Sequence, residues 1–216
     1  MDFSPRSSLT ALQTDLLREF FAREQRFFLT GGAALAGFHF GHRVTEDLDF
    51  FSPPGTPLEE GALALSTAAQ ACGAEVAAQR EHPEFRRYLV SRGDETCLVD
   101  LVVDRAPMIV TEKLTIGRAR VDPLREIAAN KICTLLGRVE VKDLLDVQQL
   151  LAAGIDLAQA VADAERKDAG VSVATLAWLM DDTETWTAAG GERLADFRAD
   201  LAKRFRAIAF AQARKD

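Results

Sequence analysis

The 216-residue chain has little of several features that would assign it to a specialised class of protein. Cys72, Cys97 and Cys133 are odd in number and widely spaced, which argues against a disulfide framework or a zinc site. We interpret them as buried thiols in a reducing compartment. No apolar run approaches the roughly 20 residues of a membrane span. The N-terminus lacks the basic and then apolar segments of a signal peptide, so we expect a cytoplasmic protein without membrane association.

Basic residues are also in the minority, with 26 lysines and arginines against 33 aspartates and glutamates. The resulting net charge of −7 argues against broad electrostatic capture of nucleic acid, although a local basic groove is compatible with it. The hydrophobic content of 48% is typical of a soluble globular protein. The length allows one large core or two small ones.

Residues 1–120 have the pattern of an α/β (α+β) core. Hydrophobic periodicity, with breaks at glycine and proline, separates helices from short strands. We expect helices over residues 8–24, 33–40 and 58–72, a turn at 31–32, and strands over 26–30, 47–51, 75–79, 85–91 and 96–103. Together these elements predict helices packed on a small mixed sheet.

The second part of the chain, residues 121–216, is helical throughout. Asp122 and Pro123 form a strong helix start, a capping carboxylate followed by proline at the first helical position. Breaks in the helical pattern fall near Gly154, Gly170 and the glycine pair at 190–191. We therefore place a domain boundary near residue 120.

Two motifs in the first part indicate phosphate and metal chemistry. Gly31 and Gly32 end an apolar segment, and glycines let a backbone approach a phosphate because they have no Cβ. Asp47 and Asp49 lie two apart on a predicted strand, so they point to one face, where they can hold a divalent cation. The two motifs together indicate a site for a nucleoside triphosphate. A strand edge facing water would explain the same aspartates.

Two charged residues interrupt apolar patterns elsewhere. Asp100 lies among β-branched and apolar residues of a predicted central strand, where a carboxylate is costly unless it is paired or metal-bound. Lys131 falls within the apolar stripe of the helix that follows Pro123. Its ammonium either reaches water along the stem or neutralises phosphate in a cleft between the two halves.

A denser polar cluster follows on the next predicted helix. Lys142 and Asp146 are four residues apart, a spacing typical of a surface ion pair worth about 0.3 kcal/mol. Taken alone, the cluster of Arg138, Lys142, Asp143 and Asp146 therefore needs no functional explanation.

Taken in order, these residues resemble the nucleotidyltransferase family of AbiEii-type toxins, within the DNA polymerase β-like superfamily. The resemblance covers roughly residues 27–152. It is carried by Thr30-Gly31-Gly32-Ala33-Ala34-Leu35, by the run from Gly41 to Phe51 around the two aspartates, by the acidic strand at Asp100, and by Lys131, Arg138 and Lys142 to Asp146.

The resemblance implies a polymerase β-like core and a helical C-terminal part that completes the active-site cleft. It implies transfer of an NMP group from an NTP to an acceptor hydroxyl, with two Mg²⁺ ions (or Mn²⁺) held by Asp47, Asp49 and Asp100. Lys131 would neutralise charge on the triphosphate. Nucleotide contacts are expected from Gly31, Gly32, Arg43, Lys131, Lys142 and Asp143.

Two positions depart from the family pattern. Ala33 follows the glycine pair, where many members have a hydroxyl that can bond a phosphate oxygen, and Lys142 replaces an arginine. We therefore weigh three functions. The first is a toxin that modifies RNA or tRNA and has a cognate antitoxin. The second is a nucleotide-binding regulator with little turnover. The third is a nucleotidyltransferase for a small molecule such as an aminoglycoside.

Overall fold

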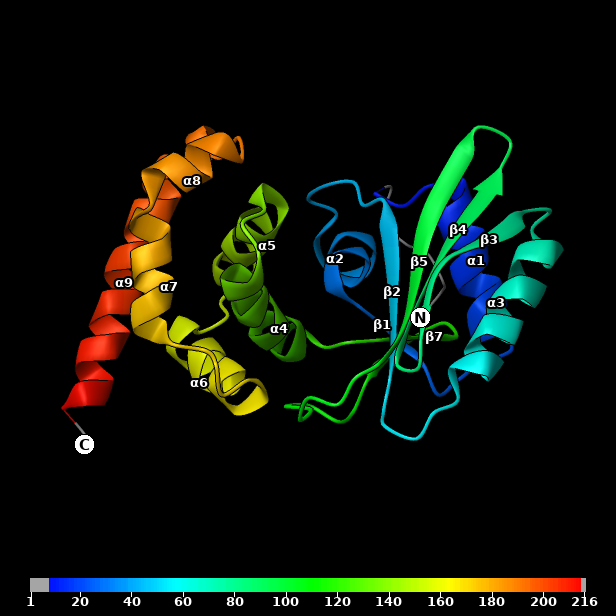
Figure 1. Ribbon diagram of the computed structural model, residues 1–216, viewed down its shortest axis with the longest axis horizontal. Coiled ribbons are helices and arrows are strands. Elements are labelled where there is room, and N and C mark those ends of the chain that lie inside the picture. Colours follow the sequence, from blue (N-terminus) through cyan, green and yellow to red (C-terminus); the bar gives the residue numbers. More distant parts are fainter. Residues whose placement is uncertain (1–7, 215–216) are drawn as a thin grey trace. The chain divides into compact units, whose positions relative to one another are not determined.

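A computed structural model describes residues 8–214 of the chain (Figure 1). Residues 1–7 and 215–216 lie outside this description, and so does the N-terminal segment that argued against a signal peptide. Two compact units are present. Unit 1 comprises Met1–Arg105 and Val110–Pro123, and unit 2 comprises Ala106–Ile109 and Leu124–Asp216.

Unit 1 is built on a mixed sheet, as the sequence predicted. In the described part of the chain seven strands hydrogen-bond in the order β3-β4-β5-β2-β1-β7-β6. The pairs β2–β5 and β1–β7 are parallel, and the other neighbours are antiparallel. The strands are β1 (Phe28–Thr30), β2 (Asp47–Ser52), β3 (Glu75–His82), β4 (Phe85–Arg92), β5 (Glu95–Val103), β6 (Leu114–Ile116) and β7 (Ala119–Val121).

Helices lie on both faces of this sheet. In Figure 1, α1 and α3 cover one face and α2 lies on the other. A capping box starts α1, because the Thr10 hydroxyl accepts from the backbone N–H of Gln13 while the Gln13 side chain accepts from the backbone of Thr10. The helices of unit 1 are α1 (Ala11–Phe21), α2 (Gly31–Ala34), a π-helix (Leu35–Phe40) and α3 (Leu58–Ala71).

The pleat of β2 divides its side chains between the core and the face that carries α2. Leu48 and Phe50 are fully buried, and the Phe50 ring centroid lies 4.2 Å from that of Phe20 on α1. Asp47, Asp49 and Phe51 alternate with them and are half-buried. The alternation predicted from the sequence is thus confirmed, and it directs both carboxylates away from the α1 side.

Several local expectations are wrong. Residues 31–32 open α2 instead of forming a separate turn. The expected helix over 33–40 is present, and its part from Leu35 to Phe40 is a π-helix. The β6–β7 hairpin was missed because strands of three residues are too short to show alternation. The sheet is therefore larger than expected.

Of the three free thiols, Cys97 is buried, but Cys72 and Cys133 are only half-buried.

The expected capping carboxylate of Asp122 has a different partner. Its Oδ1 lies 2.7 Å from Nζ of Lys113, and both side chains are buried. The same ammonium lies 4.1 Å from the ring centroid of Phe28. Asp122 therefore holds the end of the sheet together within unit 1, and α4 begins two residues later at Leu124.

Unit 2 is helical. Its elements are α4 (Leu124–Gly137), α5 (Val141–Ala152), α6 (Leu157–Lys167), α7 (Val173–Asp181), α8 (Thr183–Ala188), a 3₁₀-helix (Glu192–Leu194) and α9 (Ala195–Ala213). Across residues 8–214, every helix is too short or too polar to span a membrane.

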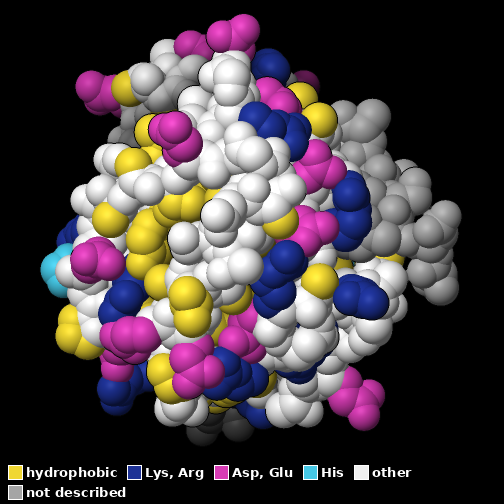
Figure 2. All heavy atoms as spheres, turned by 90° about the vertical axis from the view of Figure 1, so that its right-hand side faces the viewer, with side chains coloured by type: hydrophobic (Ala, Val, Ile, Leu, Met, Phe, Trp, Pro, Cys, Tyr) yellow, Lys and Arg dark blue, Asp and Glu magenta, His cyan; other side chains and the backbone are white. Residues whose placement is uncertain are grey.

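On the face of unit 1 that carries α3, acidic and basic side chains lie beside one another around small apolar patches (Figure 2).

Candidate active site

Three aspartates share one face of the unit 1 sheet. Strands β2 and β5 are parallel, and Asp49 is aligned with Asp100. Asp47 lies two residues before Asp49 and therefore points the same way. Residues aligned across neighbouring strands have their side chains on the same side, so the sheet brings together carboxylates that are about 50 residues apart in the chain. Asp100 is 5% exposed.

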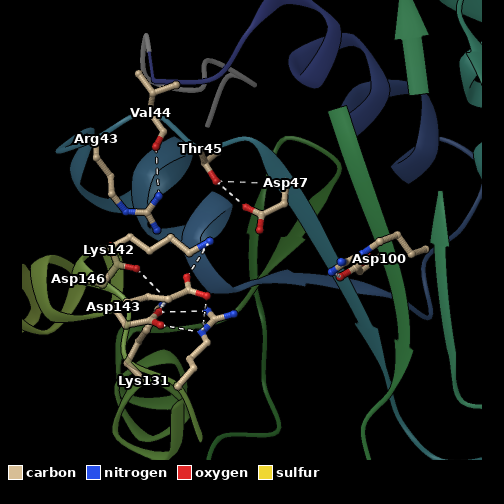
Figure 3. Close-up of polar contacts among 12 residues, drawn as sticks. Arg43, Val44, Thr45, Asp47, Asp100, Lys131, Lys142, Asp143 and Asp146 are labelled. Atoms are coloured by element: carbon tan, nitrogen blue, oxygen red, sulfur yellow. Dashed lines mark hydrogen bonds and ion pairs between the residues drawn. The ribbon is translucent and has the colours of Figure 1, made fainter. Parts of the chain in front are cut away.

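The carboxylate of Asp47 is held by a neighbouring hydroxyl. Oγ1 of Thr45 donates to Oδ1 of Asp47 at 2.9 Å (Figure 3). Thr45 is itself buried. In the sequence this threonine lies within the run from Gly41 to Phe51, but nothing in the pattern predicted a role for it. Thr45 therefore holds Oδ1 of Asp47 and does not contact Oδ2 through this hydrogen bond.

The glycine pair makes room for side chains of the protein itself. A Cβ on Gly31 would overlap with Oδ2 of Asp49, and a Cβ on Gly32 would overlap with Nη2 of Arg43. Gly31 also has φ +64°, which a residue with a side chain rarely adopts. From the sequence, the pair is expected to let the backbone approach a phosphate. In the structure, the pair already serves to place a carboxylate and a guanidinium at the start of α2.

Arg43 is oriented by a backbone contact close to this pair. Its Nη1 donates to the carbonyl oxygen of Val44 at 3.1 Å (Figure 3). Nη2 faces the backbone of Gly32. A guanidinium is thereby held within unit 1 on the α2 side of the sheet, where Asp49 also lies. This position suits a contact with the phosphates of a nucleotide.

A residue that sequence reasoning missed, Arg87, binds Asp100. Nε of Arg87 donates to Oδ1 at 2.7 Å, and Nη2 donates to Oδ2 at 2.6 Å. These hydrogen bonds, and then the charges of Asp100, Asp49 and Asp47, hold the pKa of Arg87 above its ordinary value despite the opposing effect of burial. The one available signal was the alternation of β4, which places Arg87 and not Arg86 on the carboxylate face.

Thr30 has a hydroxyl in an unusual position. It precedes the glycine pair, is 2% exposed and is aligned with Asp49 across the β1–β2 pair. Its Oγ1 is buried and has no hydrogen-bond partner among residues 8–214. A buried hydroxyl without a partner destabilises the fold, so this hydroxyl is a candidate for contact with a ligand at the carboxylate face.

These donors fit a divalent cation in part. Carboxylate oxygens are the ligands that Mg²⁺ prefers, and Asp47 and Asp49 supply them on one face. However, within residues 8–214 no group of three or more histidine, cysteine, aspartate or glutamate side chains is arranged to hold a metal ion. Both oxygens of Asp100 accept from Arg87. The metal site of three aspartates stays a prediction. Asp47 and Asp49 can supply oxygens to a cation, whereas Asp100 would first have to give up its hydrogen bonds to Arg87.

Unit 2 contains a second cluster, built around Lys131 of α4. Nζ of Lys131 lies 2.7 Å from Oδ1 of Asp143 and 2.7 Å from Oδ2 of Asp146, both on α5 (Figure 3). Arg138 adds a contact of 2.8 Å between its Nε and Oδ2 of Asp143. Lys131 is 4% exposed and both aspartates are fully buried. The ammonium therefore neither reaches water nor lacks anionic partners.

The expected surface pair between Lys142 and Asp146 is wrong. Asp146 is buried against Lys131, whereas Lys142 lies 3.1 Å from Glu140. Helix spacing allowed the first pair, but the buried ammonium of the neighbouring helix is a stronger partner than an exposed lysine.

Charge compensation sets the protonation states of this cluster. Burial alone lowers the pKa of Lys131, but the carboxylates of Asp146 and Asp143 outweigh it, so the pKa is raised. Burial likewise raises the pKa of Asp143, but hydrogen bonding to Arg138 and the charge of Lys131 bring it below its ordinary value. Both groups are therefore ionised at neutral pH, as a compensated buried pair.

Comparison with known proteins connects both units with one family. The sequence pattern of the family described as "Nucleotidyl transferase AbiEii toxin, Type IV TA system" matches residues 15–215. No protein of curated function matches the chain in sequence.

Solved structures agree with this fold. The JHP933 protein from Helicobacter pylori superposes with a TM-score of 0.62 at 16% identity, over 94% of this chain and 93% of its own. MenT4, a nucleotidyltransferase toxin from Mycobacterium tuberculosis H37Rv, superposes with a TM-score of 0.55 at 17% identity, over 93% and 86%. At these identities the likeness concerns the fold alone, and it agrees with the expected mixed α/β core followed by a helical part.

Proposed function

The chain belongs to the AbiEii family of nucleotidyl transferase toxins, and on that premise we propose that it transfers an NMP group from an NTP to an acceptor hydroxyl of an RNA. The description of the family as part of a type IV toxin–antitoxin system supports a cognate antitoxin as its partner.

The observation that carries the proposal is the shared face of Asp47, Asp49 and Asp100 beside the glycine start of α2. Arg87 compensates the charge of Asp100, but Asp47 and Asp49 place two further like charges on the same face, where they repel one another and have no packing advantage. Such an arrangement is retained where the oxygens serve a cation and a reaction centre. A purely structural role would be met as well by apolar residues on this face.

Asp47 and Asp49 are the residues that would hold a divalent cation, Mg²⁺ or Mn²⁺. When bound, such an ion stabilises the charge that develops on the attacking and leaving oxygens of a phosphoryl transfer. The chain's own contribution is to fix the ligands: Thr45 orients Asp47, and Gly31 leaves space for Asp49. Arg43 is positioned to donate to phosphate oxygens, which compensates for the missing hydroxyl at Ala33.

For unit 2, we propose that Lys131, Lys142 and Asp143 contact the nucleotide. Lys131 is held rigidly between two carboxylates, so its ammonium needs no reordering to act as a fixed positive group. The same pairing reduces the charge that it can offer a triphosphate. The effect of Lys131 on NTP affinity is therefore the most direct test of this role.

The test of the overall proposal is label transfer. The wild-type protein is incubated with each α-labelled NTP, Mg²⁺ and total cellular RNA, and the RNA is analysed for label. We expect transfer from at least one NTP and its loss in Asp49→Asn. Asp94→Asn, at an exposed position in the β4–β5 turn, is the matched control and should retain transfer. Absence of transfer by the wild type with every NTP would sink the proposal.

A regulator with little turnover is the second candidate. It is favoured by the fact that Asp100 and Lys131 are both already neutralised by partners within their own units. Calorimetric NTP binding without any labelled product would identify this function. An aminoglycoside as acceptor has no comparable support in the arrangement of charges, and the RNA experiment repeated with kanamycin in place of RNA distinguishes it.

A further inference from the structure

The pairing of Arg87 with Asp100 is a cross-strand contact at the candidate metal site. The two residues are aligned across β4 and β5, and the guanidinium meets the carboxylate side-on with contacts of 2.7 and 2.6 Å. Asp100 is aligned with Asp49 on its other side. The guanidinium therefore approaches the same row of carboxylates that a divalent cation would occupy.

The two partners differ in burial, and this difference makes the contact reversible. The Asp100 side chain is 8% exposed, whereas the Arg87 side chain is 42% exposed. In the pair of Lys113 and Asp122, by contrast, both side chains are almost fully buried, so the cation has no route to solvent. Arg87 can withdraw into water without leaving a buried charge behind, provided that another cation takes its place.

The guanidinium of Arg87 also contacts an aromatic ring. The Arg87 guanidinium lies 5.6 Å from the ring centroid of Phe85, two residues earlier on β4 and on the same face. A cation over an aromatic ring is stabilised without a carboxylate. Arg87 can therefore keep its contact with Phe85 while it gives up Asp100.

We propose that Arg87 is a built-in counter-ion that holds Asp100 in the metal-free protein and yields it to a divalent cation by exchange. The proposal rests on the proposed function, because it requires a cation at Asp47 and Asp49. Its consequence is that Arg87 sets the metal concentration at which the site fills. Arg87 is a positioning residue in this scheme, since it acts on the metal site through Asp100.

The first test measures Mn²⁺ binding by calorimetry without nucleotide, at about pH 8, well above the ordinary pKa of a carboxyl group. Arg87→Met removes the competing cation and keeps an unbranched apolar stem. We expect it to bind Mn²⁺ about tenfold more tightly than the wild type, the effect of one charge-assisted contact. Arg86→Met is the matched control, because Arg86 is the next residue on β4, faces the opposite side and pairs with Glu59. It should bind Mn²⁺ like the wild type.

The outcomes separate this inference from the function on which it rests. Equal Mn²⁺ affinity in the wild type and Arg87→Met would overturn the exchange and leave the metal site in place. No Mn²⁺ binding in either protein would overturn the exchange as well, whereas the function itself is decided by label transfer from an NTP. Loss of the tighter binding in Arg87→Met/Asp100→Asn would show that the gain acts through Asp100.

A second measurement uses the wild-type protein, so it does not depend on how well the variants fold. The Nε–H signal of Arg87 is followed by ¹⁵N NMR while Mg²⁺ is added. We expect the signal to shift and its exchange with water to accelerate as Asp100 is released. A signal that stays unchanged at saturating Mg²⁺ would overturn the exchange.

Discussion

The backbone of Gly31 lies directly against the carboxylate of Asp49, so that a Cβ at position 31 would overlap with Oδ2. The contact arises because Thr30, the preceding residue, is aligned with Asp49 across the β1–β2 pair. The left-handed φ of Gly31 then turns the chain into α2 at this point. One glycine thus ends a strand, starts a helix and accommodates a site carboxylate.

Replacing this glycine should cost more than its conformation alone explains. Gly73→Ala is the matched control, because Gly73 has φ +66° and nothing within 4 Å of a Cβ. We expect Gly73→Ala to lower the free energy of unfolding by about 1 kcal/mol, and Gly31→Ala to lower it by about 1–3 kcal/mol more because of overpacking. Urea denaturation measures both. Equal losses at the two positions would contradict the contact with Asp49.

Thr30→Val should stabilise the protein. The substitution keeps the side-chain shape and removes a buried hydroxyl without a partner in the described chain, so the free energy of unfolding should rise by about 1 kcal/mol. We expect weaker NTP binding in the same variant, because the hydroxyl lies beside Gly31 on the carboxylate face. Thr30→Ser keeps the hydroxyl and should bind NTP normally. Denaturation and calorimetry on the same samples check both expectations.

The buried cluster of unit 2 should show strong coupling. Lys131→Met leaves Asp143 and Asp146 with one cation fewer, and we expect a loss of about 3 kcal/mol in the free energy of unfolding. Asp146→Asn in the same chain should recover at least about 1 kcal/mol of it. A double-mutant cycle by urea denaturation measures the coupling, and strictly additive losses would refute it.

Acid should destabilise unit 2 through Asp143. Its folded-state pKa lies below the ordinary value of 3.8, so its stabilising contribution is present above about pH 4 and is lost as the pH falls through the folded-state pKa. Lys131 has a raised pKa, so its contribution is lost only in strong alkali. Urea denaturation from about pH 7 to about pH 3 should show a falling free energy of unfolding. Asp143→Asn should flatten this slope, and an unchanged slope would exclude Asp143 as its source.

Local pattern was enough for much of unit 1. Alternation along β2 predicted which side chains are buried, because a strand directs successive residues to opposite faces whatever surrounds it. The same pattern placed Asp47 and Asp49 on one face of their strand and identified Asp100 as a carboxylate among apolar residues. The β6–β7 hairpin was beyond this reasoning, since three residues carry too little periodicity.

By itself, the sequence determined the mixed α/β core, the helical remainder and the family, because periodicity and ordered motifs are properties of short segments. Only the tertiary structure decided which charges meet. Arg87 binds Asp100 through strand register, and Lys131 binds Asp143 and Asp146 through helix packing. Both pairings join neighbouring elements of the chain, and they depend on the register of two strands or the packing of two helices, which the spacing within one element does not reveal.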